Sequence, residues 1–126
     1  MSERPQSAAT WFEIPTLSIE RAQAFYEQVL EMNMQSFADE NPMVVFPKDP
    51  AGTGGALVQR EFQKPCDSGT VVYLSCKGDL APVLERVKAK GGSILIPKTE
   101  ITGGFGFFAC IRDTEGNTVG LHSTGQ

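Results

Sequence analysis

Bulky apolar and polar residues alternate over short stretches of the chain, and two longer stretches repeat apolar residues with a helical period. Residues 11–14 alternate in this way and end at Pro15, as is typical of a strand that runs into a turn. Ser18 is suited to cap a following helix that ends near Met32. The apolar positions of that helix share one face: Ile19, Ala22, Phe25, Tyr26, Val29 and Leu30. Turn-forming residues then separate three predicted strands, at 34–37, 43–46 and 56–59.

The same order of elements recurs in the second half of the chain. A strand is predicted over 71–76, and Asp79 is suited to cap a helix over 80–90 that Gly91-Gly92 ends. The next strand, over 93–96, is predicted to end at Pro97. Two more strands are predicted, at 105–112 and 118–122.

A shift of 61 residues superposes the two halves. It brings Ile19 onto Leu80 and Trp11 onto Val72, and it keeps the apolar positions in register. We therefore predict an α+β fold of two βαβββ modules. The expected boundaries are a tail over 1–10 and a single domain over 11–126, with module one at about 11–60 and module two at about 71–123.

Composition and charge narrow the class of protein. The chain has 126 residues, 40% of them hydrophobic, and a net charge of −4. Because its lysines and arginines are scattered, no basic stripe is available to bind nucleic acid. No apolar stretch is long enough to span a bilayer, and residues 1–10 do not resemble a secretory signal. Cys66, Cys76 and Cys110 make an odd count without metal-site spacing, so reduced thiols and a cytoplasmic location are expected.

Three segments carry a family resemblance: WFEIPTLSIERAQAFYEQVLEMN, DLAPVLERVKAKGGSILIPKTEI and FFACIRDTEGNTVGLH. In this order they resemble the vicinal oxygen chelate superfamily, the group of glyoxalases, bleomycin-resistance proteins and extradiol dioxygenases. The resemblance covers residues 11–123 and implies that the strands curl around a cavity with the helices on the outer face. It also implies a small-molecule ligand, a homodimer and a metal site with ligands from the first and last strand of each module.

The positions at which the resemblance implies metal ligands hold other residues here. The opening-strand position falls on Trp11, and its counterpart in the second half is Val72. The closing strand has Gly120 where relatives carry Glu, and the position on the strand at 56–59 is apolar, either Ala56 or Val58. Metal chemistry needs several nitrogen or oxygen donors that converge. We therefore expect no metal at the family site and no cofactor, although a divalent ion at another site is left open.

Two titratable residues are expected on the cavity side of their strands. Phe12 and Ile14 are expected to face the helix, which leaves Glu13 toward the cavity, and the same alternation directs His122 there. They are candidate catalytic residues, or simply a strand-end carboxylate paired with an arginine and a solvated histidine. The predicted ligand pocket is lined by Trp11, Glu13, Val72, Leu74, Gly120 and His122.

The sequence leaves open whether the protein is an enzyme. The first hypothesis is a metal-independent protein that binds a small molecule in an apolar pocket. The second is a glyoxalase-like lyase or isomerase with Glu13 as base and His122 as acid, with or without a divalent ion. The third is an interaction domain whose own side chains fill the cavity.

Overall fold

The computed structural model describes residues 4–38 and 40–125, and it contains the predicted order of elements twice. The first module consists of β1 (Trp11–Pro15), α1 (Ile19–Leu30), β2 (Gln35–Phe37), β3 (Met43–Val45) and β4 (Gly54–Val58). The second consists of β5 (Tyr73–Ser75), α2 (Leu80–Ala89), β6 (Ser93–Glu100), β7 (Phe107–Arg112) and β8 (Thr118–Ser123). The predicted α+β fold of two βαβββ modules is confirmed.

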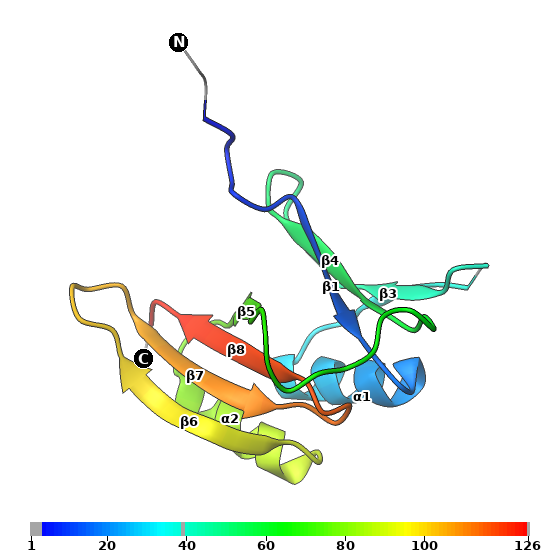
Figure 1. Cartoon of the computed structure of the whole chain (residues 1–126). Coiled ribbons are helices and arrows are strands. Elements are labelled where there is room, and N and C mark those ends of the chain that lie inside the picture. The colour runs from blue at the N-terminus through cyan, green and yellow to red at the C-terminus, as the bar shows by residue number, and fades with distance from the viewer. Residues whose placement is uncertain (1–3, 39, 126) are drawn as a thin grey trace.

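Each module forms a four-stranded mixed sheet that is not closed. The strand orders are β1-β4-β3-β2 and β5-β8-β7-β6. The opening strand of each module pairs in parallel with the closing strand, and the other pairs are antiparallel. Figure 1 shows the two sheets splayed apart, with α1 and α2 on one side of them. This order makes β1 and β5 edge strands, each with one side of its backbone unpaired within its own sheet.

The two helices bury the apolar faces that their sequences predict. The side chain of Ser18 accepts a hydrogen bond from the amide of Arg21 and begins α1, and Asp79 caps α2 in the same way through the amide of Ala81. The buried residues of both helices and both sheets form one cluster, so the modules share a hydrophobic core. Its helical members are Ile19, Ala22, Phe25, Tyr26 and Val29 from α1 and Leu80, Val83, Leu84 and Val87 from α2.

The turn between β7 and β8 holds the modules together. The hydroxyl of Tyr26 on α1 donates to Asp113 Oδ2 at 2.7 Å, and Asn117 Nδ2 donates to the carbonyl oxygen of Pro15 at 2.8 Å. Asp113 and Asn117 are both buried, so these bonds satisfy polar groups that water does not reach. The segment that most resembles the family in sequence therefore positions β1 and α1 of the other module.

Strand bounds differ from the sequence prediction by a few residues, as in β5 and β7, and two further differences affect the fold. The prediction that a strand ends at Pro97 is wrong, because β6 continues to Glu100. Pro97 lies in a stretch where the pairing with β7 shifts register, between Ile96 and Thr99, and β6 is an edge strand. At a bulge on an edge strand the missing N–H of proline costs no ladder hydrogen bond.

The superposition of Trp11 on Val72 is off by one residue. Thr16 donates its amide to Val58 and Cys76 donates its amide to His122, both at 2.8 Å, so the strands correspond with a shift of 60 (16 to 76) rather than 61. The link between β5 and α2 is one residue longer than the link between β1 and α1, which restores the shift of 61 in the helices. Phe12 therefore corresponds to Val72, and Trp11 corresponds to Val71.

Candidate functional site

A cavity of about 690 Å³ lies between the edge strands β1 and β5. Residues of β1, of the segment 70–75 and of the C-terminal end of α1 form its walls. Its apolar lining consists of Ala9, Trp11, Phe12, Leu30, Met32, Phe46, Pro47, Val71, Val72, Tyr73 and Leu74. Its polar lining consists of Glu13, Thr53, Thr70 and Ser75. Volume and lining are those of a small-molecule site.

The cavity contains four of the six predicted pocket residues, namely Trp11, Glu13, Val72 and Leu74. Gly120 and His122 do not line it or either of the other two cavities described below. Leu74 is 6% exposed and belongs to the core, as expected for the counterpart of Ile14. The cavity therefore opens partly on the helix side of the sheets, where Phe12 and Leu30 lie, rather than only on the face that the sequence indicated.

The carboxylate of Glu13 is held by three donors. Arg60 Nη1 donates to Oε1 at 2.7 Å, Trp11 Nε1 donates to Oε2 at 3.2 Å, and Gln63 Nε2 donates to Oε1 at 3.3 Å. Partial burial raises the pKa of this carboxyl, but the hydrogen bonds outweigh it and hold the pKa below its usual value. Glu13 is thus an ionised, paired carboxylate at neutral pH, which makes it a weak base.

His122 lies on β8, in the sheet opposite to that of Glu13. Its Nε2 donates to the carbonyl oxygen of Phe105 at 2.8 Å, in the glycine-rich loop before β7. Val119 and Leu121 are buried in the core, on the side of this strand where the alternation places them. The structure does not bring Glu13 and His122 into a common cavity among those described here.

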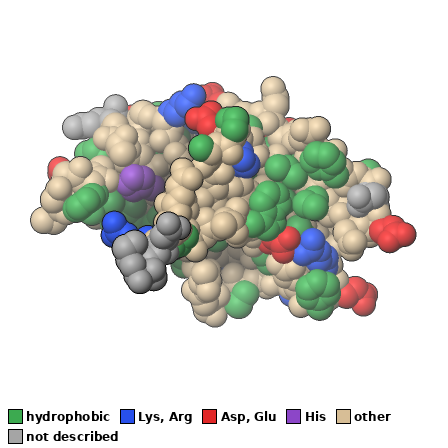
Figure 2. All heavy atoms as spheres, turned by 90° about the horizontal axis from the view of Figure 1, so that it is seen from above, with side chains coloured by type: hydrophobic (Ala, Val, Ile, Leu, Met, Phe, Trp, Pro, Cys, Tyr) green, Lys and Arg blue, Asp and Glu red, His purple; other side chains and the backbone are tan. Residues whose placement is uncertain are grey.

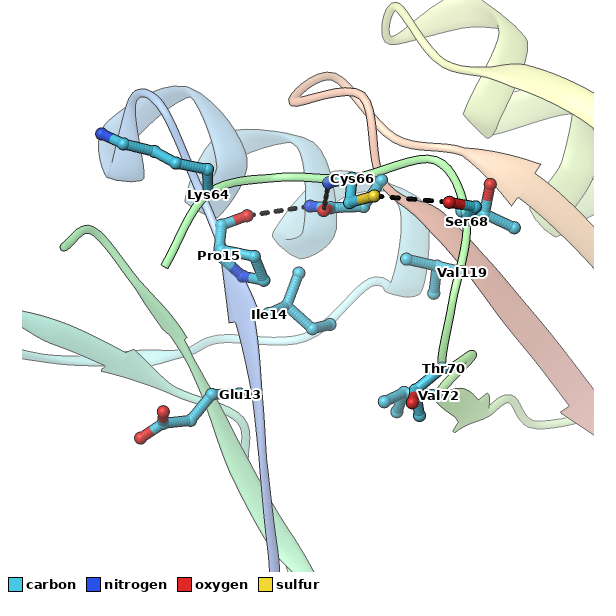
Figure 3. Close-up of a pocket in the computed structure, with 11 residues that line it drawn as sticks. Glu13, Ile14, Pro15, Lys64, Cys66, Ser68, Thr70, Val72 and Val119 are labelled. Atoms are coloured by element: carbon cyan, nitrogen blue, oxygen red, sulfur yellow. Dashed lines mark hydrogen bonds between the residues drawn. The ribbon is translucent and has the colours of Figure 1, made fainter. Parts of the chain in front are cut away.

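A smaller cavity, of about 160 Å³, lies under the segment that connects the modules. Figure 3 shows Cys66 and Ser68 at its rim and the side chain of Glu13 pointing away from Thr70 and Val72. The amide of Cys66 donates to Asn117 Oδ1 at 3.0 Å, which ties this segment to the β7–β8 turn. The cavity therefore lies where the connecting segment packs against the rest of the chain, and these structural contacts explain its presence.

The residues at the expected metal positions do not fit a metal centre. Glu13 pairs with Ala56 on β4, and Tyr73 pairs with Gly120 on β8, so Ala56 and Gly120 are equivalent in the two modules. Neither has a donor side chain, and neither does Trp11 or its counterpart Val71. Within residues 4–38 and 40–125, no three His, Cys, Asp or Glu side chains are grouped so as to hold a metal ion.

Several large apolar side chains are exposed. Figure 2 shows hydrophobic side chains in separate patches on one face of the molecule, with charged side chains beside and between some of the patches. The most exposed are Phe62 at 84% and Phe105 at 67%, and Tyr73 is 51% exposed. Tyr73 and Phe108 stack edge to face, with ring centroids 6.3 Å apart. Exposed aromatic residues on sheet faces and loops provide surface for a partner or a ligand.

The comparisons agree with this architecture. The model of the Glyoxalase/Bleomycin resistance protein/Dioxygenase superfamily matches residues 9–121, and the chain therefore belongs to this family. No curated protein matches the chain. In the part of the chain that the structure describes, neither the 12-residue α1 nor the 10-residue α2 is long enough to cross a membrane.

Solved structures of similar fold have low sequence identity to the chain. A glyoxalase/bleomycin resistance protein from Albidiferax ferrireducens superposes with a TM-score of 0.69 at 16% identity, over 93% of this chain and 98% of its own. The fosfomycin resistance protein FosX from Listeria monocytogenes was solved with Mn(II) and a dihydroxypropylphosphonic acid. It superposes with a TM-score of 0.66 at 14% identity, over 95% of this chain and 93% of its own. Glyoxalase I from Zea mays superposes with a TM-score of 0.67 at 18% identity, over 90% of this chain and 45% of its own.

Sequence reasoning missed Arg60 and Gln63, the partners of Glu13. Both follow β4, in the link to β5, and they bond to each other through Arg60 Nη1 and Gln63 Oε1 at 3.0 Å. Their only signal in the sequence is an arginine directly after a predicted strand, which is common at any strand end. The parallel pairing of β1 with β4 brings the two strand ends together.

Proposed function

We propose that this protein binds a small organic molecule, without a metal, in the cavity between β1 and β5. The observation that carries the proposal is the cavity itself, with about 690 Å³ of space and walls that are mostly apolar. Ligand sites typically have volumes of about 300–1,000 Å³ and a few polar groups that orient the ligand. An interaction domain would fill such a space with its own side chains.

The alternative, a lyase or isomerase with Glu13 as base and His122 as acid, has less support. Joint proton transfer needs both groups within hydrogen-bond reach of one substrate. The carboxylate of Glu13 is hydrogen-bonded to Arg60, and the lowered pKa of Glu13 makes this carboxylate a weaker base. His122 bonds to a loop carbonyl on the other sheet. A binding function in the cavity needs no proton transfer by either residue.

We also propose that two copies of the chain associate and that the protein works in the cytoplasm. Exposed Phe105 and Tyr73 support the association, since they offer apolar surface to a second copy. The free thiols of Cys66, Cys76 and Cys110 support a reducing compartment. Light scattering coupled to size-exclusion chromatography tests the association, and a mass of 13.6 kDa at all concentrations contradicts it.

The binding proposal is tested by a variant that blocks the cavity. Ser75 lines the cavity and is exposed, so Ser75→Phe is expected to fill the space without disturbing the core. Ser93→Phe, at an exposed strand position that lines none of the three cavities, is the matched control. Neutral aliphatic and aromatic alcohols serve as probes, each measured with a chelator and again with an added divalent ion.

Binding is read from the fluorescence of Trp11, the single tryptophan of the chain, and from the rise in melting temperature. At a probe concentration of a hundred times Kd, the stabilisation is about 2.7 kcal/mol. We expect the control to bind like the unmodified protein and Ser75→Phe to bind at least about tenfold more weakly, a loss of about 1.4 kcal/mol. Equal binding by both variants, or binding that requires a divalent ion, refutes the proposal.

A further inference from the structure

A second hollow, of about 750 Å³, adjoins the cavity between β1 and β5. The two share the lining residues Leu30, Met32, Pro47, Thr53 and Ser75. The two spaces are therefore direct neighbours, and a ligand that occupies both would lie against these shared side chains. The chemistry of the two spaces differs, and this difference indicates which kind of molecule fits both.

The second hollow is charged, and its balance is opposite to that of the whole chain. Among the described residues, three cations line it, namely Lys48, Lys77 and Arg86, against two acids, Glu31 and Asp49. The difference is 3 − 2 = +1, whereas the chain as a whole carries −4. A locally positive hollow in an acidic protein attracts an anion over the protein's own background.

Two of these cations lack a carboxylate partner. Lys77 makes no hydrogen bond or ion pair within the described residues, and Lys48 Nζ bonds only to the carbonyl oxygens of Asp49 and Pro50, both at 3.2 Å. Arg86 differs from the two lysines because its Nε already donates to the carbonyl oxygen of Val29 at 2.9 Å. Lys48 and Lys77 are therefore the groups that remain available to an anion.

The apolar cavity offers no competing attraction for a cation. Of the described residues that line it, Glu13 alone is charged, and three donors already hold its carboxylate. In Figure 3 this carboxylate also points away from Val72, on the opposite wall. The favourable place for negative charge is thus the hollow beside Lys48 and Lys77.

We propose that the ligand is an amphipathic anion, with an aliphatic or aromatic body between β1 and β5 and a carboxylate beside Lys48 and Lys77. This inference rests on the proposed binding function and adds the ligand class. The body gains free energy from leaving water against Trp11 and Phe46. The carboxylate gains charge-assisted hydrogen bonds from the two ammonium groups.

Three probes with the same body and different heads test the ligand class: decanoate, decanol and decylammonium. Trp11 fluorescence measures each Kd on the full chain at low ionic strength. We expect decanoate to bind about tenfold more tightly than decanol, because one decade is about 1.4 kcal/mol and a hydrogen bond to a charged group contributes about that amount. Added salt is expected to weaken the binding of decanoate and to leave decanol unchanged.

The double variant Lys48→Gln, Lys77→Gln tests whether the carboxylate of decanoate binds in the hollow. Both side chains are exposed, so the fold should be retained, and the binding of decanol verifies this directly. We expect decanoate to bind the double variant no better than decanol does. Lys90→Gln, at an exposed lysine that lines neither space, is expected to keep the tenfold preference.

The outcomes separate this inference from the function on which it rests. Equal affinity for decanoate and decanol, or tighter binding of decylammonium, overturns the anionic class while Ser75→Phe still shows that the cavity binds ligands. A preference for decanoate that survives in the double variant overturns the assignment of the head to Lys48 and Lys77. Absence of binding by all three probes contradicts the proposed function and this inference together.

Discussion

Arg21 on α1 and Glu115 in the turn between β7 and β8 form a two-point ion pair that joins the two modules. Arg21 Nε donates to Glu115 Oε2 at 2.7 Å, and Nη2 donates to Oε1 at 3.0 Å. Glu115 also accepts hydrogen bonds from the amides of Leu17 and Ser18, each at 2.8 Å, just before α1 begins. One carboxylate of the second module thus satisfies the free amides at the start of the first helix.

Removal of this carboxylate is expected to destabilise the whole domain. The side chain of Glu115 is fully buried, so Glu115→Ala leaves two amides and a guanidinium without their partner. The expected loss in the free energy of unfolding is about 3 kcal/mol, since breaking a buried pair from one side costs about 3–5 kcal/mol and Arg21 is half exposed. Urea denaturation measures it.

Glu85→Ala is the matched control for this substitution. Glu85 pairs with Lys88 at 3.0 Å, and both side chains are mostly exposed. Its loss is expected to cost no more than about 0.5 kcal/mol. Similar costs for the two substitutions would show that Glu115 does not couple the modules.

Stability is expected to fall in acid because of the same residue. Burial alone would raise the pKa of Glu115, but hydrogen bonds from Arg21 and two backbone amides outweigh it and lower the pKa from 4.5 to about 2. Between these values the unfolded chain binds the proton that the folded protein excludes. The contribution is therefore complete above pH 4.5 and is lost as the pH falls toward 2, and it amounts to about 3 kcal/mol.

Glu115→Gln isolates this contribution, since glutamine does not titrate. The difference in unfolding free energy between the unmodified protein and this variant is expected to shrink as the pH falls from about 6 to about 2. Denaturant melts at several pH values measure it, and the other acids cancel in the difference. A difference that stays constant with pH would contradict the assigned pKa.

Two glycines of the loop before β7 are expected to respond differently to alanine. Gly104 and Gly106 both have positive φ, at 82° and 95°, so Ala costs about 1–2 kcal/mol at either position. At Gly106 the added Cβ would also collide with the backbone of Ser123, whereas at Gly104 no atom of the other described residues, its chain neighbours aside, lies within 4 Å of it. Gly106→Ala is therefore expected to lower the melting temperature further than Gly104→Ala, and calorimetry checks this order. The reverse order would contradict the described path of the loop.

Cys66 is expected to react with thiol reagents before the other cysteines. Hydrogen bonds from the amide and hydroxyl of Ser68 lower its pKa, and its side chain is exposed. Burial raises the pKa of Cys76 to about 11, and Cys110 is buried. Since the thiolate is the reactive form, one fast phase of modification near neutral pH is expected, lost in Cys66→Ser. A fast phase that survives in this variant would assign the reactivity elsewhere.

The sequence predicts the individual helices and strands well, but it predicts their arrangement relative to one another less well. Helix caps at Ser18 and Asp79 and the apolar faces of both helices are as expected, because capping and helical period are local properties. The strand that begins at Ser93 was predicted, but its continuation past Pro97 was not, since proline is tolerated there only because β6 is an edge strand with a bulge. Edge position depends on the order of strands in the sheet, which no local pattern contains.

The candidate site shows the same division. Alternation along β1 correctly separated Trp11 and Glu13 from Phe12 and Ile14. It could not show that Arg60 and Gln63 would donate hydrogen bonds to the carboxylate of Glu13. These residues follow β4, and only the parallel pairing of β1 with β4 brings them beside Glu13. Nor could it place His122 relative to Glu13, since the two lie on different sheets.

The sequence by itself determined the doubled βαβββ order, the family and the absence of donor side chains at the expected metal positions. Each of these follows from the identity and spacing of residues along the chain. Only the tertiary structure decided the cavity between β1 and β5, the hollow beside Lys48 and Lys77, and the link from Arg21 to Glu115. The physical reason is that these features join residues distant in sequence, and packing of the two modules on one core sets their separation.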